Sequence, residues 1–515
     1  MKGHGMKHII TKVLMCLLSI LIIMLVPVSA YAEGTYTYIY DYWKDIQDSP
    51  DFYSPSKVYT STDLGLDVNL NSPKSLFVHG DLLYICDSGN NRIIECRRNE
   101  AKEIEVVSII DSFKGGNGPT TFSNPTDIAV SEEGDFFIAD QGNARILKLD
   151  KDLNYVLEFA KPDDNTLDKD LVFQPGRLTI DTAGRVYCIA KGINKGLIKY
   201  ENDATFSGFV GATKVTFDWT DYIWKKFATQ AQRALMESFV PTEYDNLYMD
   251  KEGFIYVVTG APDDLDLKNG SADAVRKINM MGNDILVRNG EWNIIGDQYM
   301  GSGGGYEGHS YLTDITVLDN DIYVCLDKNR GRLFGYDDQG NMVFGFAGIG
   351  NMDGYFRGPI SLEHMGYDLI VLDPLDCAIT IFEPTYYGQL VYQAIDLFDD
   401  GKYTESGKCW EEVLSINGNY DLGYIGVGRS LLRQERYHEA MEYFELKYDA
   451  ENYSKAYKQY RKEWVEKNIV IIVTVILLLF LVPFAIKKVL SIKHEIDTDE
   501  FFTRGIYNDG KQNKD

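Results

Sequence analysis

Short, mainly apolar runs bounded by turn-forming residues recur along most of this chain. In one stretch, between residues 127 and 160, they read DIAV, DFFIAD, ARILKL and YVLEFA. The segments between these runs, SEEG, QGN and KDLN, are rich in turn-forming residues. Apolar runs this short, bounded by turn residues, predict β-strands, and the turn segments predict hairpins between them. This stretch therefore predicts four short antiparallel strands.

The same unit recurs along the chain. Its six copies contain NSPKSLFVHGDLLYICD, NPTDIAVSEEGDFFIAD, QPGRLTIDTAGRVYCIA, EYDNLYMDKEGFIYVVT, YLTDITVLDNDIYVCLD and GPISLEHMGYDLIVLD. Copies lie about fifty residues apart where nothing is inserted, a period typical of repeat architectures. Repeated four-stranded sheets predict a six-bladed β-propeller. The last copy lacks a fourth strand, and the alternating segment Thr35–Tyr42 (TYTYIYDY) is expected to supply it and close the ring.

Several residues of the unit resemble those of the NHL-repeat family of six-bladed propellers. A proline begins four copies, at Pro73, Pro125, Pro175 and Pro359. A second strand of the form G-x-[FY]-[FIV] and a turn of the form D-x-G-N-x-R-[IV] follow. The resemblance runs from about Asn71 to Pro384 and implies a propeller over residues 33–386. The third copy has Ala190 in place of the aspartate, and the fourth has no such turn.

An aspartate and an arginine five residues apart flank this turn. The pairs are Asp87–Arg92, Asp140–Arg145 and Asp327–Arg332. The carboxylate is placed to accept hydrogen bonds from the N–H groups of the turn, and glycine permits a positive φ there. Because the arginine can reach back to the carboxylate, we expect each pair to stabilise its turn rather than take part in catalysis.

The composition changes to helix-forming residues from Gly388 onward. Tyr403 and Tyr437 are 34 residues apart, as are Trp410 and Phe444. This period, with Gly428, Tyr437, Ala440 and Phe444 in their usual places, resembles the tetratricopeptide (TPR) family. Two repeats are expected within residues 387–462. The resemblance implies a groove that binds a protein partner; the alternative is a spacer between the propeller and the membrane.

Two apolar segments lie near the ends of the chain. Residues 1–32 combine three lysines, an apolar run and the motif AYA, which predicts a signal peptide cleaved after Ala32; an uncleaved anchor is the alternative. Ile469–Ile486 is long and apolar enough for one transmembrane helix, placed at 468–487. The signal peptide then orients the protein, with the propeller outside a plasma membrane and residues 488–515 in the cytoplasm.

The net charge argues against one class of partner, and the positions of the cysteines predict whether they form disulfides. The formal net charge is −26, from 77 acidic and 51 basic residues among 515. Nucleic acid is held mainly through phosphate contacts from Lys and Arg, so a nucleic-acid partner is not expected. Cys86 and Cys96 are close in sequence, but in the predicted hairpin their sulfurs lie beyond disulfide reach. The other four cysteines, Cys188, Cys325, Cys377 and Cys409, fall in different repeats, so buried free thiols are expected rather than disulfides.

The mouth of the central channel is the first candidate binding site. The residue before the first aliphatic position of each inner strand should line it, and all six of these residues are polar: Ser75, Asp127, Arg177, Asn246, Asp314 and Ser361. A solvated channel whose polar groups satisfy one another is one interpretation. The other is a site for a small polar ligand such as a sugar or a peptide. Asp and Asn oxygens suit Ca²⁺, but the adjacent arginine disfavours a cation.

An insertion between the third and fourth copies is a second candidate. Asp218–Phe239 carries apolar residues at helical spacing and predicts an amphipathic helix. Trp219, Tyr222 and Trp224 on this helix are candidates for a lid over the channel; packing against the propeller is the alternative. The glycine-rich loop Gly301–His309 lacks the Lys-Ser/Thr of a phosphate loop, so nucleotide binding is not expected.

These patterns favour a binding or scaffold protein over an enzyme. We found no histidine spacing typical of a metal site and no nucleophile elbow, so no catalytic residue, metal or cofactor is expected. The arrangement resembles bacterial membrane proteins that combine NHL and TPR repeats, and this resemblance implies an accessory role beside a transporter or envelope complex. The rival hypothesis is a metal-assisted lyase or lactonase that holds its metal with Asp127, Asn246 and Asp314.

Overall fold

The structure is a computed structural model that describes residues 36–116, 118–212, 244–260, 267, 272–288, 293–302 and 306–509. The predicted signal peptide and the predicted insertion helix lie outside these residues. The chain forms two compact units. Unit 1 comprises Met1–Tyr392 and Ile416–Tyr420, and unit 2 comprises Gln393–Ser415 and Asp421–Asp515.

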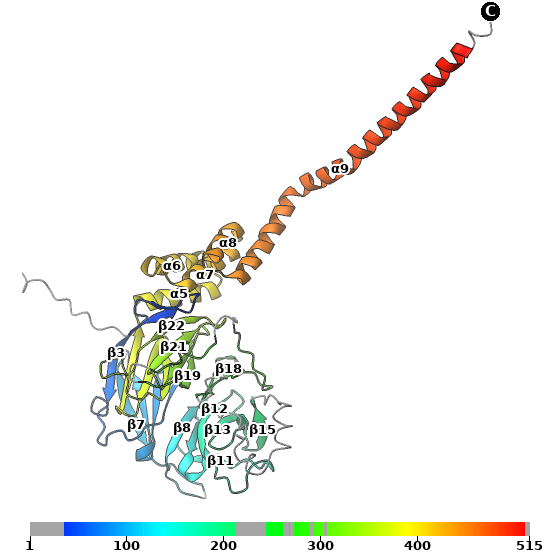
Figure 1. Cartoon of the computed structure of the whole chain (residues 1–515). Helices are drawn as coiled ribbons and strands as arrows, with labels where there is room; N and C mark the ends of the chain where they lie inside the picture. Colours follow the sequence, from blue (N-terminus) through cyan, green and yellow to red (C-terminus); the bar gives the residue numbers. More distant parts are fainter. Residues whose placement is uncertain are drawn as a thin grey trace, which may run out of the picture. The chain divides into compact units, whose positions relative to one another are not determined.

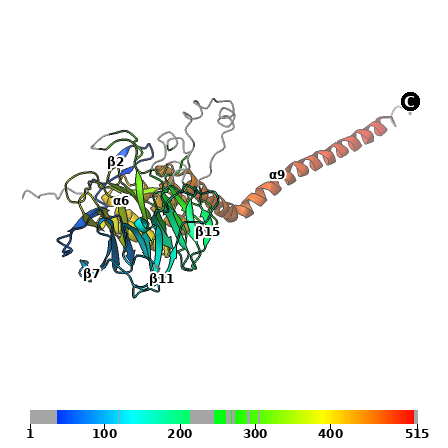
Figure 2. The ribbon, with the colours of Figure 1, turned by 90° about the horizontal axis from the view of Figure 1, so that it is seen from below.

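Unit 1 is a six-bladed β-propeller, as the repeats predict (Figure 1). Blade 1 contains β4 (Ser75–His79), β5 (Leu82–Asp87), β6 (Arg92–Arg98) and β7 (Ile104–Ile110). Blade 2 contains β8 (Pro125–Val130), β9 (Phe136–Asp140), β10 (Arg145–Leu149) and β11 (Tyr155–Phe159). Blade 3 contains β12 (Pro175–Ile180), β13 (Val186–Ala190), β14 (Leu197–Tyr200) and β15 (Phe206–Val210). The outer strands β7, β11 and β15 follow one another along one side of the propeller (Figure 2).

The remaining blades depart from the simple four-stranded unit. Blade 4 has three strands among the described residues, β16 (Asn246–Met249), β17 (Ile255–Val258) and β18 (Val275–Ile278). Blade 5 contains β19 (Leu312–Val317), β20 (Tyr323–Asp327), β21 (Arg332–Tyr336) and β22 (Met342–Phe346), extended by β1 (Tyr38–Tyr40) and β2 (Ile46–Asp48). Blade 6 contains β23 (Ser361–Met365), β24 (Asp368–Asp373), β25 (Ala378–Pro384) and β3 (Tyr53–Thr60).

The ring is closed by an N-terminal strand, but not by the predicted one. β3 pairs with β25 along its whole length, from Tyr53 opposite Pro384 to Thr60 opposite Ala378 (Figure 1, blue beside yellow). β1, from the segment predicted to close the ring, instead pairs with β22 of blade 5. The sequence of β3, YSPSKVYT, shows little apolar alternation and contains a proline. Such a strand fits the outer edge of a blade, where proline does not interrupt a hydrogen-bonded ladder.

Hydrophobic layers between neighbouring blades form the core of the propeller. The layer between blades 1 and 2 is one example, with Tyr84, Ile93 and Ile110 of blade 1 packed against Ile128, Ile138 and Leu147 of blade 2. The six inner strands contact one another in the order β4, β8, β12, β16, β19 and β23, and β23 contacts β4 again. All six described cysteines are free thiols, as expected; four are buried, and Cys377 and Cys409 are half-buried.

The C-terminal region is helical, as predicted. α5 (Tyr386–Asp399) is followed by α6 (Tyr403–Ile416), α7 (Asp421–Arg433), α8 (Tyr437–Leu446) and α9 (Ala450–Asp509). α6 and α8 begin at the two tyrosines that are 34 residues apart. Phe444 is fully buried, and a Cβ added to Gly428 would lie 2.5 Å from its ring. Glycine at this position therefore lets α7 and α8 pack closely.

α9 carries the predicted transmembrane segment. Its residues Ala450–Asp499 contain a window with a mean hydropathy of 3.3 whose side chains are not buried inside the protein. By length and composition this helix could span a membrane. Pro483 lies within the helix. Trp464 is exposed just before the apolar run.

Candidate functional site

The six polar residues predicted to line the channel all lie at or near the start of the inner strands. Five of them are nevertheless buried: Ser75, Asp127, Asn246, Asp314 and Ser361. Only Arg177 keeps an appreciably exposed side chain, at 14%. The inner strands have one edge without a strand partner, so their N–H groups need acceptors from elsewhere. The buried side chains provide these acceptors.

Hydrogen bonds from these side chains connect neighbouring inner strands. The Asp127 carboxylate accepts the N–H of Leu178 in the next blade at 2.8 Å. The Asp314 carboxylate accepts the N–H of Leu362 at 2.7 Å. Ser361 Oγ accepts the N–H of Leu76 at 3.0 Å, across the closure between blades 6 and 1. The polar residues therefore stabilise the ring by joining one blade to the next.

The other two contacts of this ring link Arg177 and Asn246 to the two aspartates. An Arg177 nitrogen lies 3.7 Å from Asp127, and a second one donates to the Lys74 carbonyl at 3.0 Å. The Asn246 side-chain amide donates to Asp314. The structure thus brings Arg177 to Asp127 and Asn246 to Asp314. Arg177 is the member of this ring whose side chain is appreciably exposed.

Two further residues of the inner strand β23, Glu363 and His364, were not selected from the sequence. They follow Ser361 in the segment SLEHM. Glu363 is buried, and its carboxylate interacts electrostatically with Asp314 and Asp127. His364 Nδ1 lies 2.7 Å from Thr316 Oγ1. Glu363 and His364 each occur at their position in one copy of the repeat alone, so no periodic pattern marked them.

Burial changes the protonation of this group of residues. Burial raises the pKa of Asp314 to about 6, against the opposing effects of Arg177 and of the N–H groups of Leu362 and Ile315. Burial, reinforced by Asp314 and Asp127, raises the pKa of Glu363 well above its usual range. Burial lowers the pKa of His364 to about 4. Burial thus favours the neutral form of both side chains, the carboxyl of Glu363 and the imidazole of His364.

The raised pKa of Asp314 predicts a dependence of stability on pH. A carboxyl whose pKa is higher in the folded chain binds its proton more tightly there, so its stabilisation is present below about pH 4 and lost as pH rises through about 6. In Asp314→Asn this loss should be absent. The measurement is urea unfolding of a soluble chain ending at Lys462, with and without the substitution, at several pH values from about 4 to 7. The difference in free energy of unfolding between the two proteins should change by up to about 3 kcal/mol over this range. Parallel pH profiles would contradict the prediction.

The Asp–Arg pairs of blades 1 and 2 form as predicted. Asp87 accepts a hydrogen bond from Arg92 Nε at 2.7 Å, and Asp140 accepts one from Arg145 Nε at 2.9 Å. Both carboxylates are fully buried. A 3₁₀ turn follows each aspartate, η1 (Ser88–Asn90) and η2 (Gln141–Asn143). These pairs stabilise the turns between the second and third strands of their blades.

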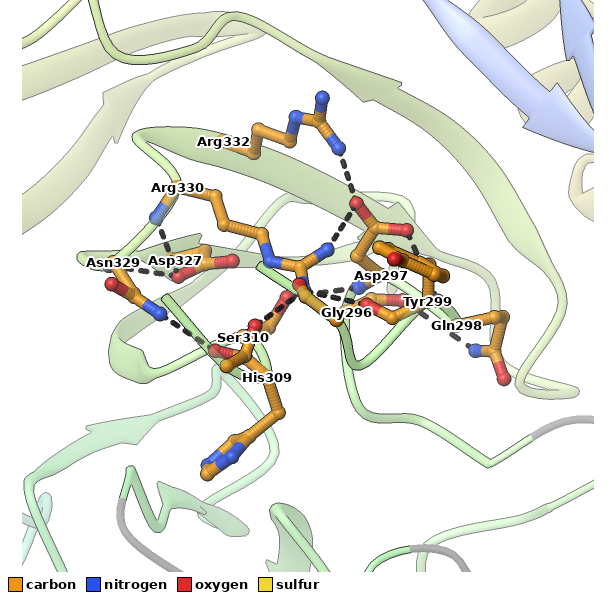
Figure 3. Close-up of polar contacts among 12 residues, drawn as sticks. Gly296, Asp297, Gln298, Tyr299, His309, Ser310, Asp327, Asn329, Arg330 and Arg332 are labelled. Atoms are coloured by element: carbon orange, nitrogen blue, oxygen red, sulfur yellow. Dashed lines mark hydrogen bonds and ion pairs between the residues drawn. The ribbon is translucent and has the colours of Figure 1, made fainter. Parts of the chain in front are cut away.

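The third predicted pair, Asp327–Arg332, is wrong. Arg332 instead reaches Asp297, which is also bound by Arg330 at 2.5 Å (Figure 3). Arg332 also donates to the Tyr38 hydroxyl at 3.1 Å. Asp327 accepts the N–H groups of Tyr311, Asn329 and Arg330. Asp297 lies in the long connection between blades 4 and 5, so no repeat pattern pointed to it. Tyr40 donates to the same carboxylate, so this cluster also attaches β1 to blade 5.

The remaining sequence predictions concern a lid over the channel and a metal site. Trp219, Tyr222 and Trp224, the candidate lid, lie outside the described residues, so the lid stays a prediction. No group of three or more His, Cys, Asp or Glu side chains is placed to hold a metal ion in the part of the chain that the structure describes.

The fold places this protein in the class of six-bladed β-propellers, here with a C-terminal helical region. No protein-family model and no curated protein matches the sequence. Among solved structures, a virginiamycin B lyase from Staphylococcus aureus is 10% identical, with 64% of this chain and 99% of the lyase covered and a TM-score of 0.37. A streptogramin B lyase is 9% identical, with 64% and 98% covered and a TM-score of 0.37. A Bacteroides caccae protein of unknown function is 8% identical, with 61% and 93% covered and a TM-score of 0.32. Similarities at this level carry no information about function.

Proposed function

We propose that this protein is a membrane-anchored binding protein. Its propeller is held outside a plasma membrane by α9, and it binds a small polar ligand or an envelope partner. The helical region recognises a protein, as its resemblance to TPR repeats implies. An accessory role beside a transport or envelope complex is the function that best fits this combination.

The observation that carries the proposal is the state of the channel residues. Asp127, Asp314 and Ser361 are held by hydrogen bonds to the next blade. The inner ring is therefore preorganised, and only the Arg177 guanidinium is presented to an incoming ligand. Preorganised polar groups cost little to order on binding, which favours recognition. An anionic or hydrogen-bond-accepting group on the ligand would suit this arginine.

A thermal-melting screen of the chain ending at Lys462 tests this binding site. Sugars and short peptides are added singly, because a ligand that binds only the folded protein raises its melting temperature. Loss of the shift in Arg177→Ala, with the shift kept in a variant of an exposed arginine such as Arg97→Ala, would support the channel site. A shift that both variants keep would place the ligand elsewhere.

The anchor makes a separate prediction. Replacing Leu477 and Leu478 with lysine should move the protein from the membrane fraction to the soluble fraction. Each charge at the centre of a span costs about 3 kcal/mol in insertion, so two should be enough to prevent it. The measurement is fractionation with alkaline carbonate, with Leu477→Ala and Leu478→Ala as the size control. Unchanged membrane retention of the lysine variant would argue against a span at Ile469–Ile486.

A second candidate function is an enzyme, a lyase or lactonase that works in the channel. The buried Glu363 on the inner strand β23 favours it, since burial raises the pKa of this carboxyl well above its usual range, and a carboxylic acid with a raised pKa can serve as a general acid. Metal analysis of the purified protein separates the two functions. Stoichiometric Ca²⁺ or Zn²⁺ that is lost in Asp127→Ala or Asp314→Ala would support the metal-assisted enzyme over the binding protein.

A further inference from the structure

Blade 6 contains a cavity of about 530 Å³ that has no counterpart in the predictions from sequence. It lies between the loop of residues 350–357 and the two outermost strands of the blade, β25 and β3. Asp373, Asp376, Ala378 and Arg357 contribute to its lining. Its size is within the range of small-molecule sites. The cavity lies on the outer half of the blade, so it is separate from the channel on the inner strands.

In blades 1 and 2 an arginine occupies the corresponding position. Arg92 is paired across the hairpin with Asp87, and Arg145 with Asp140. Besides binding its aspartate, each arginine donates to a carbonyl of the loop that enters the blade. These carbonyls belong to Val68, at 2.6 Å, and Pro119, at 2.7 Å. The guanidinium thus fills the space between the strand and the entering loop.

A guanidinium also occupies the corresponding position in blade 5, although it comes from a different residue. Arg330 is fully buried and donates to the carbonyl of Gly308 at 2.6 Å. Gly308 lies three residues before Tyr311, whose N–H binds Asp327, just as Val68 lies three residues before Asn71, whose N–H binds Asp87. Three blades that carry the turn aspartate therefore hold a guanidinium beside the entering loop.

Blade 6 keeps the aspartate but lacks the arginine. Asp373 is paired across the hairpin with Ala378, in the register that pairs Asp140 with Arg145. A second change increases the negative charge, because Asp376 stands where blades 1 and 2 have Asn90 and Asn143. Removing one cation and adding one carboxylate makes this position more negative by two charges than its counterparts.

Asp373 is buried, and no guanidinium among the described residues is paired with it. It is 3% exposed, and its oxygens accept the N–H groups of Arg357, Gly358 and Leu375. The Arg357 side chain lies 3.2 Å from Asp376, but 56% and 37% of the two side chains are exposed. An exposed pair of this kind contributes little and leaves Asp373 without a cation. A cationic ligand would gain both from this charge and from the cavity.

We propose that the blade 6 cavity binds a guanidinium group in the place of the missing arginine. The N–H groups on one edge of the guanidinium donate to the carboxylates of Asp373 and Asp376. Another donates to the carbonyl of Gly354, which lies three residues before Arg357, in the position that Val68 and Gly308 have in the other blades. The guanidinium comes either from a free small molecule or from an arginine side chain of a peptide.

Isothermal titration of the full-length protein in detergent with methylguanidinium, and with its neutral analogue methylurea, tests the proposal. We expect saturable binding of methylguanidinium, with a dissociation constant of about 1 mM or lower, and no binding of methylurea. L-arginine and the peptide Gly-Arg-Gly then distinguish the source. Equal affinities indicate a small-molecule ligand, and at least tenfold tighter binding of the peptide indicates an arginine side chain.

Three variants test the site: one fills it, one weakens it and a third is a control. Ala378→Arg supplies the missing guanidinium from the chain itself and should weaken methylguanidinium binding at least tenfold while raising the melting temperature. Asp376→Asn, at an exposed position that is safe for folding, should weaken it several-fold. Leu375→Arg adds the same charge on an exposed neighbour and should leave the affinity within twofold of that of the unmodified protein. No saturable binding, or equal binding by Ala378→Arg and the unmodified protein, would overturn the proposal.

Discussion

A chain that begins at Ser61 should lose the cooperative unfolding of the propeller, whereas one that begins at Ser49 should keep it. The longer truncation removes β3, the strand that closes blade 6. It also removes the buried rings of Phe52, Tyr53 and Tyr59. Deleting one large buried aromatic side chain costs about 3–5 kcal/mol, and a domain has only about 5–15 kcal/mol of stability in total. The loss of three rings and a whole strand should therefore exceed what the propeller can tolerate.

Aromatic packing explains why β3 matters so much. The Phe52 ring lies 4.5 Å from that of Phe344, and the Tyr53 ring lies 5.0 Å from that of Phe346, both in blade 5. The Tyr53 hydroxyl donates to the Tyr367 carbonyl at 2.9 Å. β3 therefore joins blade 6 to blade 5 as well as completing its sheet.

Thermal unfolding followed by circular dichroism, on chains ending at Lys462, measures the difference. The chain that begins at Ser49 lacks β1 and β2 and should melt at a lower temperature than the complete propeller, but in one transition. A sharp transition for the chain that begins at Ser61 would show that β3 is not required for closure.

The replacement of Asp140 by alanine should destabilise the propeller by about 3–5 kcal/mol. Arg145 is 7% exposed and would keep its buried charge with only the Glu158 carboxylate, which is 3.7 Å away and 45% exposed. Breaking a buried ion pair from one side has this cost because the desolvation penalty of the remaining charge is no longer offset. The N–H of Ser123, which donates to Asp140 at 2.7 Å, would lose its acceptor as well.

Urea denaturation of the chain ending at Lys462 gives the free energy of unfolding. Glu103→Ala is a suitable control, because it breaks a 3.0 Å pair with Lys57 whose side chains are 55% and 45% exposed. That variant should lose less than about 1 kcal/mol. The double variant Asp140→Leu with Arg145→Leu should be less damaging than Asp140→Ala alone, since it leaves no unpaired charge. Equal losses for Asp140→Ala and Glu103→Ala would contradict the expected role of burial.

The sequence predicted most of the propeller because the relevant signals are local. The four strands of blade 2 appear where the short apolar runs between turn residues place them, and Pro125 and Pro175 begin β8 and β12. The pairs Asp87–Arg92 and Asp140–Arg145 are confirmed because their residues face each other within one hairpin. The start of α6 at Tyr403 and of α8 at Tyr437 follows the 34-residue period.

The candidate site was harder to predict, for a physical reason. The six channel residues were found from their equivalent places in the repeats, but most of them are turned toward the next blade rather than toward the channel. Glu363 was missed because a single carboxylate in one copy has no periodic signal. The cavity in blade 6 depends on the absence of an arginine at position 378, and an absence has meaning only after the strands are aligned in space.

Sequence alone thus determined the elements of this protein, namely the repeated strands, the helical region and the apolar segment at Ile469–Ile486. These follow from side-chain periodicity and turn chemistry, which act over a few residues. Tertiary structure decided which strand closes the ring, which carboxylate binds Arg332, and where a cavity remains. Each of these depends on contacts between residues far apart in the chain. Among them, burial of Phe52 and Tyr53 against blade 5 outweighed the better strand pattern of Thr35–Tyr42.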